Sequence, residues 1–275
     1  MSLKNGIKLK KTMFVVTTKC NIKCDNCNSF INKYIFPISY DRKTLVSDAR
    51  NLLEFVDSIE ELVILGGETF LNRNLDYLLE YLFEGEYSNK VETITISTNG
   101  TIIPNIETLK ILKKHKEKNT IIISKYFDMC ETIVPELKKF DINYVINEPS
   151  PWRKNGKMNL HHRSEEELDK LYKGCFFRNE YDGLVLNGEL HICPISAHAK
   201  DLKIIPDYKS DYLKFREGSV SSKIEGYDVF NNQSHLQCCD HCEAVLNEIV
   251  ERTYTCMHVK YSRINKLKAQ LNSID

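Results

Sequence analysis

Three cysteines near the start of the chain have a spacing that suits metal chemistry. Cys20, Cys24 and Cys27 follow the pattern Cys-x3-Cys-x2-Cys, so their thiolates can point at one centre from a single loop. A structural zinc site normally takes four protein ligands, and no fourth Cys or His lies near Cys27 in sequence. A [4Fe-4S] cluster bound by three cysteines keeps one iron open for another ligand. The spacing favours such a cluster, and zinc completed by a distant residue is the alternative.

A second set of cysteines lies in the later part of the chain. Cys175 and Cys193 are followed far downstream by the run Cys-Cys-Asp-His-Cys at residues 238–242. A Cys-x2-Cys pair with two further cysteines is enough for a closed site of four thiolates, which could hold zinc or an iron-sulfur cluster. Cys130 is expected to be a buried, small apolar residue without a ligand role.

Composition narrows the class of protein. The 275 residues include 38 Lys and Arg and 38 Asp and Glu, so no net positive charge attracts nucleic acid or a membrane surface. Ten cysteines are too few for a disulfide scaffold, in which their share exceeds roughly 8%. The N-terminus makes a poor signal peptide, and no apolar run reaches the roughly 20 residues of a membrane span. We therefore expect a cytoplasmic, reducing location, where clustered cysteines more often bind metal.

The first half of the chain alternates between strand and helix patterns. Short apolar, β-branched runs predict buried strands at residues 14–18, 62–65, 93–97, 120–124 and 144–146. Helical stripes of apolar residues lie between them at residues 52–59, 75–82 and 106–112. This alternation predicts right-handed βαβ units and a parallel sheet of the α/β class.

The pattern changes near residue 150. An acidic helix is predicted at 165–172, a hairpin around Asn187-Gly188, a less regular region to about Ser234 and a short helix at 244–251. A basic tail at 260–268 fits a solvated helix face. We expect one domain over residues 1–170 and a smaller cysteine-bearing module over residues 171–275.

The unusual residues follow the predicted strands directly. After the first strand comes the three-cysteine loop, after the second Gly66-Gly67-Glu68, after the third Thr98-Asn99-Gly100, and after the fourth Ser124. Because ligands bind at the carboxyl ends of parallel strands, one edge of the sheet should collect all of them.

With these motifs in this order, the chain resembles the radical S-adenosylmethionine (AdoMet) enzymes. The resemblance implies a partial (β/α)6 TIM-like barrel and a first [4Fe-4S] cluster on Cys20, Cys24 and Cys27. The open iron of that cluster would bind AdoMet and cleave it to a 5′-deoxyadenosyl radical. An electron donor of the flavodoxin or ferredoxin type is implied as a partner, with no nucleic acid and no membrane.

The resemblance also assigns AdoMet contacts. Glu68 and the Gly66-Gly67 backbone should meet the methionyl amine, and Ser97, Asn99 and Ser124 are candidates for the ribose and carboxylate. A tight turn at the glycines and an ordinary strand end at the serines are the structural alternatives. Asn26 departs from the family, which usually has an aromatic residue or His before the third cysteine. Adenine would then be held by a polar contact or by another loop.

The C-terminal part resembles the truncated auxiliary-cluster module called twitch, a short form of the SPASM module. The match is Cys-x12-Gly-x4-Cys from Cys175 to Cys193, followed by a Cys-x2-Cys pair. The resemblance implies a β-hairpin plus helix module that binds a second [4Fe-4S] cluster through Cys175, Cys193, Cys239 and Cys242. Cys238 would be spare, and the full SPASM continuation is absent because residue 248 is Glu.

This layout is similar to that of the butirosin-type amino-cyclitol dehydrogenases. It implies oxidation of a small-molecule alcohol, a sugar, cyclitol or aminosugar of natural-product or polysaccharide biosynthesis, with the second cluster as electron acceptor. Arg153 is a candidate base or substrate anchor, although it could equally pack at the barrel end. Radical epimerisation with Cys256 or Cys238 as hydrogen donor is an alternative.

Two further functions stay open from the sequence. Peptide maturation is less favoured, because the first strand is expected to begin at Phe14 and leaves no room before it for a peptide-recognition domain. A zinc-stabilised binding module without catalytic activity, which could include His161, His162 and His241, is the non-enzyme alternative.

Overall fold

One mixed sheet organises the residues that the computed structural model describes, which are 6–24, 26–126, 128–147, 152–153, 157–243 and 249–250. Its strand order is β5-β4-β3-β2-β1-β7-β8-β9. The strands are β1 Lys8–Thr17, β2 Ser58–Gly66, β3 Val91–Thr98, β4 Asn119–Ser124, β5 Tyr144–Asn147, β7 Gly183–Leu186, β8 Glu189–His191 and β9 Tyr212–Lys214. Separately, β6 (Trp152–Arg153) pairs antiparallel with β10 (Ile249–Val250).

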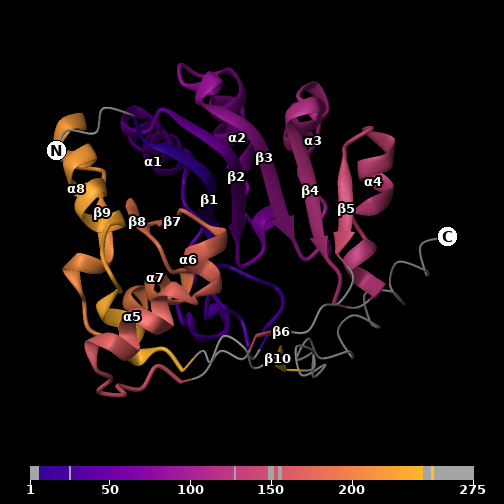
Figure 1. Ribbon diagram of the computed structural model, residues 1–275. Coiled ribbons are helices and arrows are strands. Elements are labelled where there is room, and N and C mark those ends of the chain that lie inside the picture. The colour runs from indigo at the N-terminus through magenta and orange to yellow at the C-terminus, as the bar shows by residue number, and fades with distance from the viewer. Residues whose placement is uncertain are drawn as a thin grey trace.

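The first five strands run parallel and connect through helices. Each of β1 to β4 pairs parallel with the next strand, and β7 adds a further parallel strand on the other side of β1. The helices are α1 Arg42–Phe55, α2 Leu75–Glu84, α3 Ile106–Lys114, α4 Val134–Lys139, α5 Glu165–Lys173, α6 Phe176–Glu180, α7 Pro194–Asp201 and α8 Val220–Asn231. In Figure 1 the arrowheads of β1 to β5 point to one edge of the sheet. This open, parallel-rich α/β sheet confirms the predicted partial TIM-like fold.

All five predicted strands are present, and the first is longer than expected. β1 begins at Lys8, six residues before Phe14, because its lysines alternate with buried residues such as Leu9 before the strand becomes buried on both faces. Lys11 pairs with Glu61 of β2 at 2.8 Å, and both side chains are partly exposed.

The core lies between the sheet and the helices that cover it. Leu52 and Leu53 of α1 and Leu78 and Leu79 of α2 are each 1% exposed or less. These are the apolar stripes expected from the sequence. α1 begins at residue 42, ten residues before Leu52, where the side chain of Asp41 accepts a hydrogen bond from the amide of Thr44 and caps the helix.

The hairpin expected around Asn187-Gly188 is confirmed. β7 and β8 pair antiparallel, and Asn187 and Gly188 have φ angles of 55° and 74°, as a two-residue turn of type I′ requires. The helix predicted at 244–251 is wrong at Ile249 and Val250, which form β10. β-branched residues such as these favour an extended backbone. Residues 244–248 and 251 lie outside the described part, as does the basic tail at 260–268.

The later strands continue the sheet of the first half. The expected division at residue 170 falls within α5, and β7, β8 and β9 join the sheet at β1. The less regular region before Ser234 contains α7, β9 and α8, which the sequence analysis did not predict as elements. None of the helices in the described residues is long and apolar enough to cross a membrane.

Candidate active site and cysteine-lined cavity

A cleft of about 910 Å³ opens where the parallel strands end. It collects nine of the residues expected at the first site, namely Cys20, Cys24, Asn26, Cys27, Gly66, Gly67, Ser97, Asn99 and Ser124. Ile22, Asn28, Tyr126, Asn147, Phe176 and Tyr181 also line it. None of its described lining residues is Asp, Glu, Lys, Arg or His, so this part of the cleft is polar but uncharged.

The cysteine loop connects β1 to the short helical turn Ile31–Lys33. The amide of Ile22 donates to Cys20 Sγ at 3.4 Å, and the amide of Phe30 donates to the carbonyl of Cys27 at 2.9 Å. Burial raises the pKa of Cys20 to about 12, because a thiolate there loses hydration. A metal centre must bind the thiolate, so its own positive charge would have to offset this cost.

Gly66 and Gly67 hold the end of β2 against the cysteine loop. The amide of Gly67 donates to the carbonyl of Thr17 at 2.9 Å, and that of Glu68 donates to the carbonyl of Lys19 at 2.7 Å. A Cβ atom on Gly67 would lie 2.4 Å from the Lys19 carbonyl oxygen, which no real side chain tolerates. The glycines therefore permit a direct backbone approach, in addition to lining the cleft.

Glu68 is buried beside the cleft and does not line it. Its carboxylate is 1% exposed and accepts hydrogen bonds from the amide of Phe70 at 3.1 Å, the hydroxyl of Thr98 at 2.7 Å and the amide of Asn99 at 2.7 Å. Burial raises the pKa of Glu68, and the three donors oppose that rise. The side chain joins the ends of β2 and β3, and an AdoMet contact remains a prediction from the resemblance.

A small amide network links Asn99 to the first cysteine. Asn99 Nδ2 lies 3.0 Å from Asn21 Oδ1 and 3.9 Å from Cys20 Sγ, while Asn99 Oδ1 accepts from the Thr101 hydroxyl at 2.6 Å. Asn21 Nδ2 donates to the same Thr101 hydroxyl at 2.7 Å. Asn21 and Thr101 were missed in the sequence, although Asn21 lies within the three-cysteine motif and Thr101 directly follows Gly100.

Gly100 and Cys130 explain the turn after β3. Gly100 has a φ angle of 73°, and a Cβ atom there would lie 1.8 Å from the carbonyl oxygen of Cys130. Cys130 is fully buried, as expected, and lies outside the cleft lining. Its backbone packs against Gly100, so this cysteine belongs to the support of the site.

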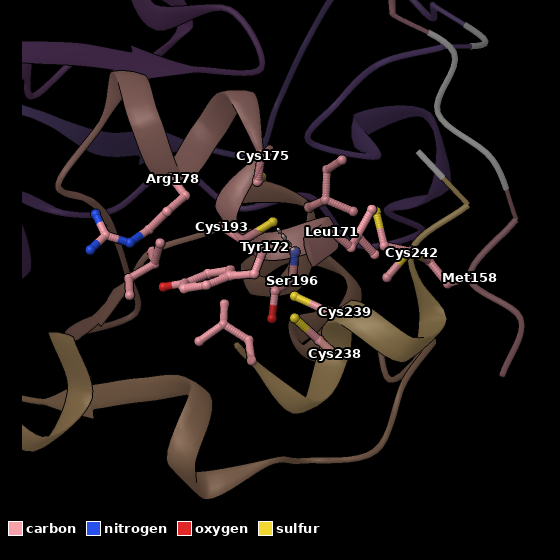
Figure 2. A pocket seen from close by; sticks show the side chains of 13 residues that line it. Met158, Leu171, Tyr172, Cys175, Arg178, Cys193, Ser196, Cys238, Cys239 and Cys242 are labelled. Carbon is pink, nitrogen blue, oxygen red and sulfur yellow. Dashed lines mark hydrogen bonds between the residues drawn. The ribbon is translucent and has the colours of Figure 1, made fainter. Parts of the chain in front are cut away.

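The second cysteine set surrounds one small cavity of about 30 Å³. Figure 2 shows Cys175, Cys193, Cys238, Cys239 and Cys242 gathered around it, and Met158, Leu171, Ile192, Ile195 and Leu236 supply much of its apolar lining. The four cysteines expected to act together are thus brought together, with Cys238 beside them.

Helix ends position the first two of these cysteines. Cys175 is the N-cap residue of α6 and Cys193 that of α7, where the amide of Ser196 lies 3.5 Å from Cys193 Sγ. Burial raises the pKa of Cys193 well above its usual range. A helix N-terminus favours negative charge, which partly opposes this effect.

Cys238 and Cys239 differ although they are adjacent. A hydrogen bond from the Cys238 thiol to Cys239 raises the pKa of Cys238 and lowers that of Cys239. Both thiols lie at the second cavity, and the ligand role of Cys239 stays a prediction from the resemblance.

Some predicted residues are not tested by these contacts. Arg153 lies in β6 opposite Ile249, and its side chain is outside the described part of the structure. Cys256 also lies outside it. Across the described ranges, no three His, Cys, Asp or Glu side chains are placed to hold a single metal ion.

The comparisons with known proteins agree with this fold. No curated protein matches the chain in sequence. The solved structures similar to it include native anSMEcpe with bound AdoMet and Kp18Cys peptide, at 14% identity and a TM-score of 0.51, covering 98% of this chain and 99% of that one. BtrN in complex with AdoMet and 2-DOIA has the same identity and TM-score and covers 91% and 99%. Residues 14–124, which carry the three-cysteine loop and the ends of β2, β3 and β4, match the model of the Radical SAM superfamily.

Proposed function

We propose that this protein is a radical AdoMet enzyme that oxidises a secondary alcohol of a sugar, cyclitol or aminosugar, with a second iron-sulfur cluster as electron acceptor. Two observations support it together: a polar cleft with three cysteines at the strand ends, and a separate cavity lined by five cysteines.

The residues of the cleft fit a cluster with AdoMet on its open iron. Cys20, Cys24 and Cys27 would each bind one iron, and the Gly66-Gly67 backbone with Asn99 would receive the methionyl group. Ser97 and Ser124 would contact the ribose or carboxylate, and Asn26 would lie near the adenine. When bound, this pair of groups supplies a 5′-deoxyadenosyl radical that takes a hydrogen atom from the substrate.

The observation that carries the oxidation is the placement of two consecutive residues. Cys175 lines the second cavity, and Phe176 lines the cleft together with Tyr181, which directly follows α6. The beginning of α6 therefore separates the two sites by one residue. A single electron leaving a substrate in the cleft has a short covalent route to the second cavity.

Conversion of a secondary alcohol to a ketone removes one hydrogen atom, one proton and one electron. The hydrogen atom would leave with the radical formed in the cleft, and a cluster held by Cys175, Cys193, Cys239 and Cys242 would supply the acceptor for the electron. Since the described lining of the cleft lacks a carboxylate, Lys or His, Arg153 is the proposed residue to anchor the substrate, and the released proton would pass to solvent. Amide and hydroxyl groups in the cleft suit a hydroxyl-rich substrate.

Epimerisation requires a thiol in the cleft that returns hydrogen to the substrate. Cys238 lines the second cavity and is 3% exposed, which disfavours it as this donor. Cys256 is the remaining candidate for the hydrogen donor of an epimerase. Deuterium from solvent in a stereoinverted product would support epimerisation, whereas an oxidised product without solvent deuterium on carbon would refute it.

A peptide substrate is a second candidate, supported by the likeness of the fold to a structure with a bound peptide. A flavodoxin- or ferredoxin-type protein would supply the electron that starts either reaction.

The test begins with anaerobically purified protein. Two [4Fe-4S] clusters correspond to about eight irons and eight sulfides per chain. Incubation with AdoMet, reductant and a panel of cyclitols and aminosugars should give 5′-deoxyadenosine and a ketone. Cys24→Ala should abolish both products, whereas Cys193→Ala should reduce the ketone more than 5′-deoxyadenosine. A colourless protein that contains only zinc would refute the proposal.

A further inference from the structure

The segment that leads into α5 lies against the Cys239–Cys242 turn. The amide of His161 donates to the carbonyl of Asp240 at 3.0 Å. The amides of His162 and Arg163 donate to the Asp240 carboxylate at 3.2 and 2.9 Å. Three successive backbone amides therefore hold the residue in the middle of the Cys-x2-Cys pair.

The side chain of Arg163 holds both ends of the same turn. Its Nη1 donates to the carbonyl of Cys239 at 3.0 Å, and its Nη2 donates to the carbonyl of Cys242 at 3.0 Å. The guanidinium group is planar and stays charged, so it fixes the separation of the two carbonyls as a rigid fork. The two residues it spans are the ones proposed to bind the second cluster.

Other charged groups surround the turn. The buried carboxylate of Asp211 accepts from the amides of Gln237 and Cys238 at 2.9 and 2.8 Å, and Asp240 adds a second negative charge. Arg178 lines the cavity itself. Arg163 is thus a cation that touches the ligand turn directly, and Asp211 and Asp240 are the carboxylates that accept hydrogen bonds in the same region.

We infer that Arg163 is a positioning residue of the second cluster, which clamps the carbonyls of Cys239 and Cys242 and raises the reduction potential of the cluster bound there. This inference rests on the proposed second cluster. Positive charge and hydrogen bonding close to the ligands stabilise the reduced, more negative cluster. The clamp would make the second site a better acceptor for the electron from the substrate.

The test measures the second cluster alone in the full-length chain. A Cys20→Ala, Cys24→Ala, Cys27→Ala background removes the ligands of the first cluster. Arg163→Gln removes the charge, Arg163→Lys keeps the charge without the fork, and Lys170→Gln removes an exposed charge from the neighbouring α5 as the matched control. Iron content and the midpoint potential, followed by electron paramagnetic resonance, are the two readouts.

We expect Arg163→Gln to lower the equilibrium constant for reduction about tenfold, which is about 59 mV for one electron. Arg163→Lys should lower the midpoint potential by less than half as much as Arg163→Gln does, but it should lose iron faster to a chelator. Lys170→Gln should match the background protein in both readouts. Arg163→Gln could also remove the iron of the second site altogether. The same substitution is then made in the chain with Cys20, Cys24 and Cys27 intact. Loss of the second-site iron with retention of the first cluster also supports the clamp.

An Arg163→Gln protein with the iron content and potential of the background protein would overturn the inference. Failure of the proposed function gives a different result, since the background protein itself would then lack second-site iron before any change at Arg163.

Discussion

Replacing Glu68 with Gln separates a structural role of this side chain from a direct contact with AdoMet. One carboxylate oxygen accepts from the amide of Phe70 and the hydroxyl of Thr98, and the other accepts from the amide of Asn99. Gln has one oxygen and one NH2 group. In either orientation, its NH2 faces a backbone N–H of Phe70 or Asn99, so one buried donor loses its partner.

The cost follows from that lost partner. A buried donor without an acceptor destabilises a protein by about 1–3 kcal/mol. For a chain of this size, each kcal/mol corresponds to roughly 2–4 °C in Tm, so Glu68→Gln should lower Tm by roughly 2–12 °C. The amide of Asn99 would shift with it, and AdoMet binding should weaken as a secondary effect.

The assay is thermal unfolding of the anaerobically purified protein with and without AdoMet, together with calorimetric AdoMet binding. Glu80→Gln is the control, because Glu80 is exposed on α2. An unchanged unfolding midpoint combined with much weaker AdoMet binding would refute the structural role of the Glu68 hydrogen bonds. It would favour the amine contact that the family resemblance implies.

Three further predictions follow from particular contacts. Gly67→Ala should release iron from the first site, because its Cβ would lie 2.4 Å from a backbone carbonyl, whereas Gly174→Ala, with its nearest atom at 3.6 Å, should leave the iron content unchanged. Cys239→Ser should remove about four irons per chain, whereas Cys238→Ser should keep them; equal losses in iron assays would contradict the ligand assignment. Burial lowers the pKa of His198 to about 3 from a usual value near 6.5. Below pH 6.5 this histidine is therefore protonated in the unfolded chain but neutral in the folded one, so the free energy of unfolding falls as the pH drops. Lowering the pH from 6.5 to 5 should cost about 2 kcal/mol in urea unfolding, and His198→Asn should flatten this dependence; an equal slope in both proteins would refute it.

Much of the parallel sheet could be predicted because its signals are local. Buried strands show as apolar, β-branched runs, and Asn187-Gly188 specifies its own turn. α8 was harder to predict, since its buried residues Lys223, Tyr227 and Phe230 include a charged side chain and form only a narrow stripe. Lys223 is buried because it reaches Asn51 and Glu54 of α1, which are distant in sequence.

Many of the residues that line the cleft could be predicted from their motifs, whereas the hydrogen bonds they make could not. Strand ends gather ligands by topology, so most of the nine cleft residues followed from motif order, and Asn26 and Ser97 followed from the family resemblance. The direction of a side chain depends on its neighbours in space, and for this reason the hydrogen bonds of the Glu68 carboxylate with Thr98 and Asn99 could not be predicted from the motif. Phe176 and Tyr181 carry no motif, and only the folding of α6 against the cleft reveals them.

The position of β7 beside β1 has a consequence for how the protein is made. Asp182, just before β7, accepts from the amide of Lys11 across 171 residues of sequence. During synthesis, the edge of β1 that pairs with β7 therefore stays unpaired until the ribosome has produced the β7–β8 hairpin. An unpaired buried strand is a site for pairing with other chains. Production of this protein should thus be sensitive to conditions that slow completion of the chain, and a fragment that stops before residue 183 should aggregate.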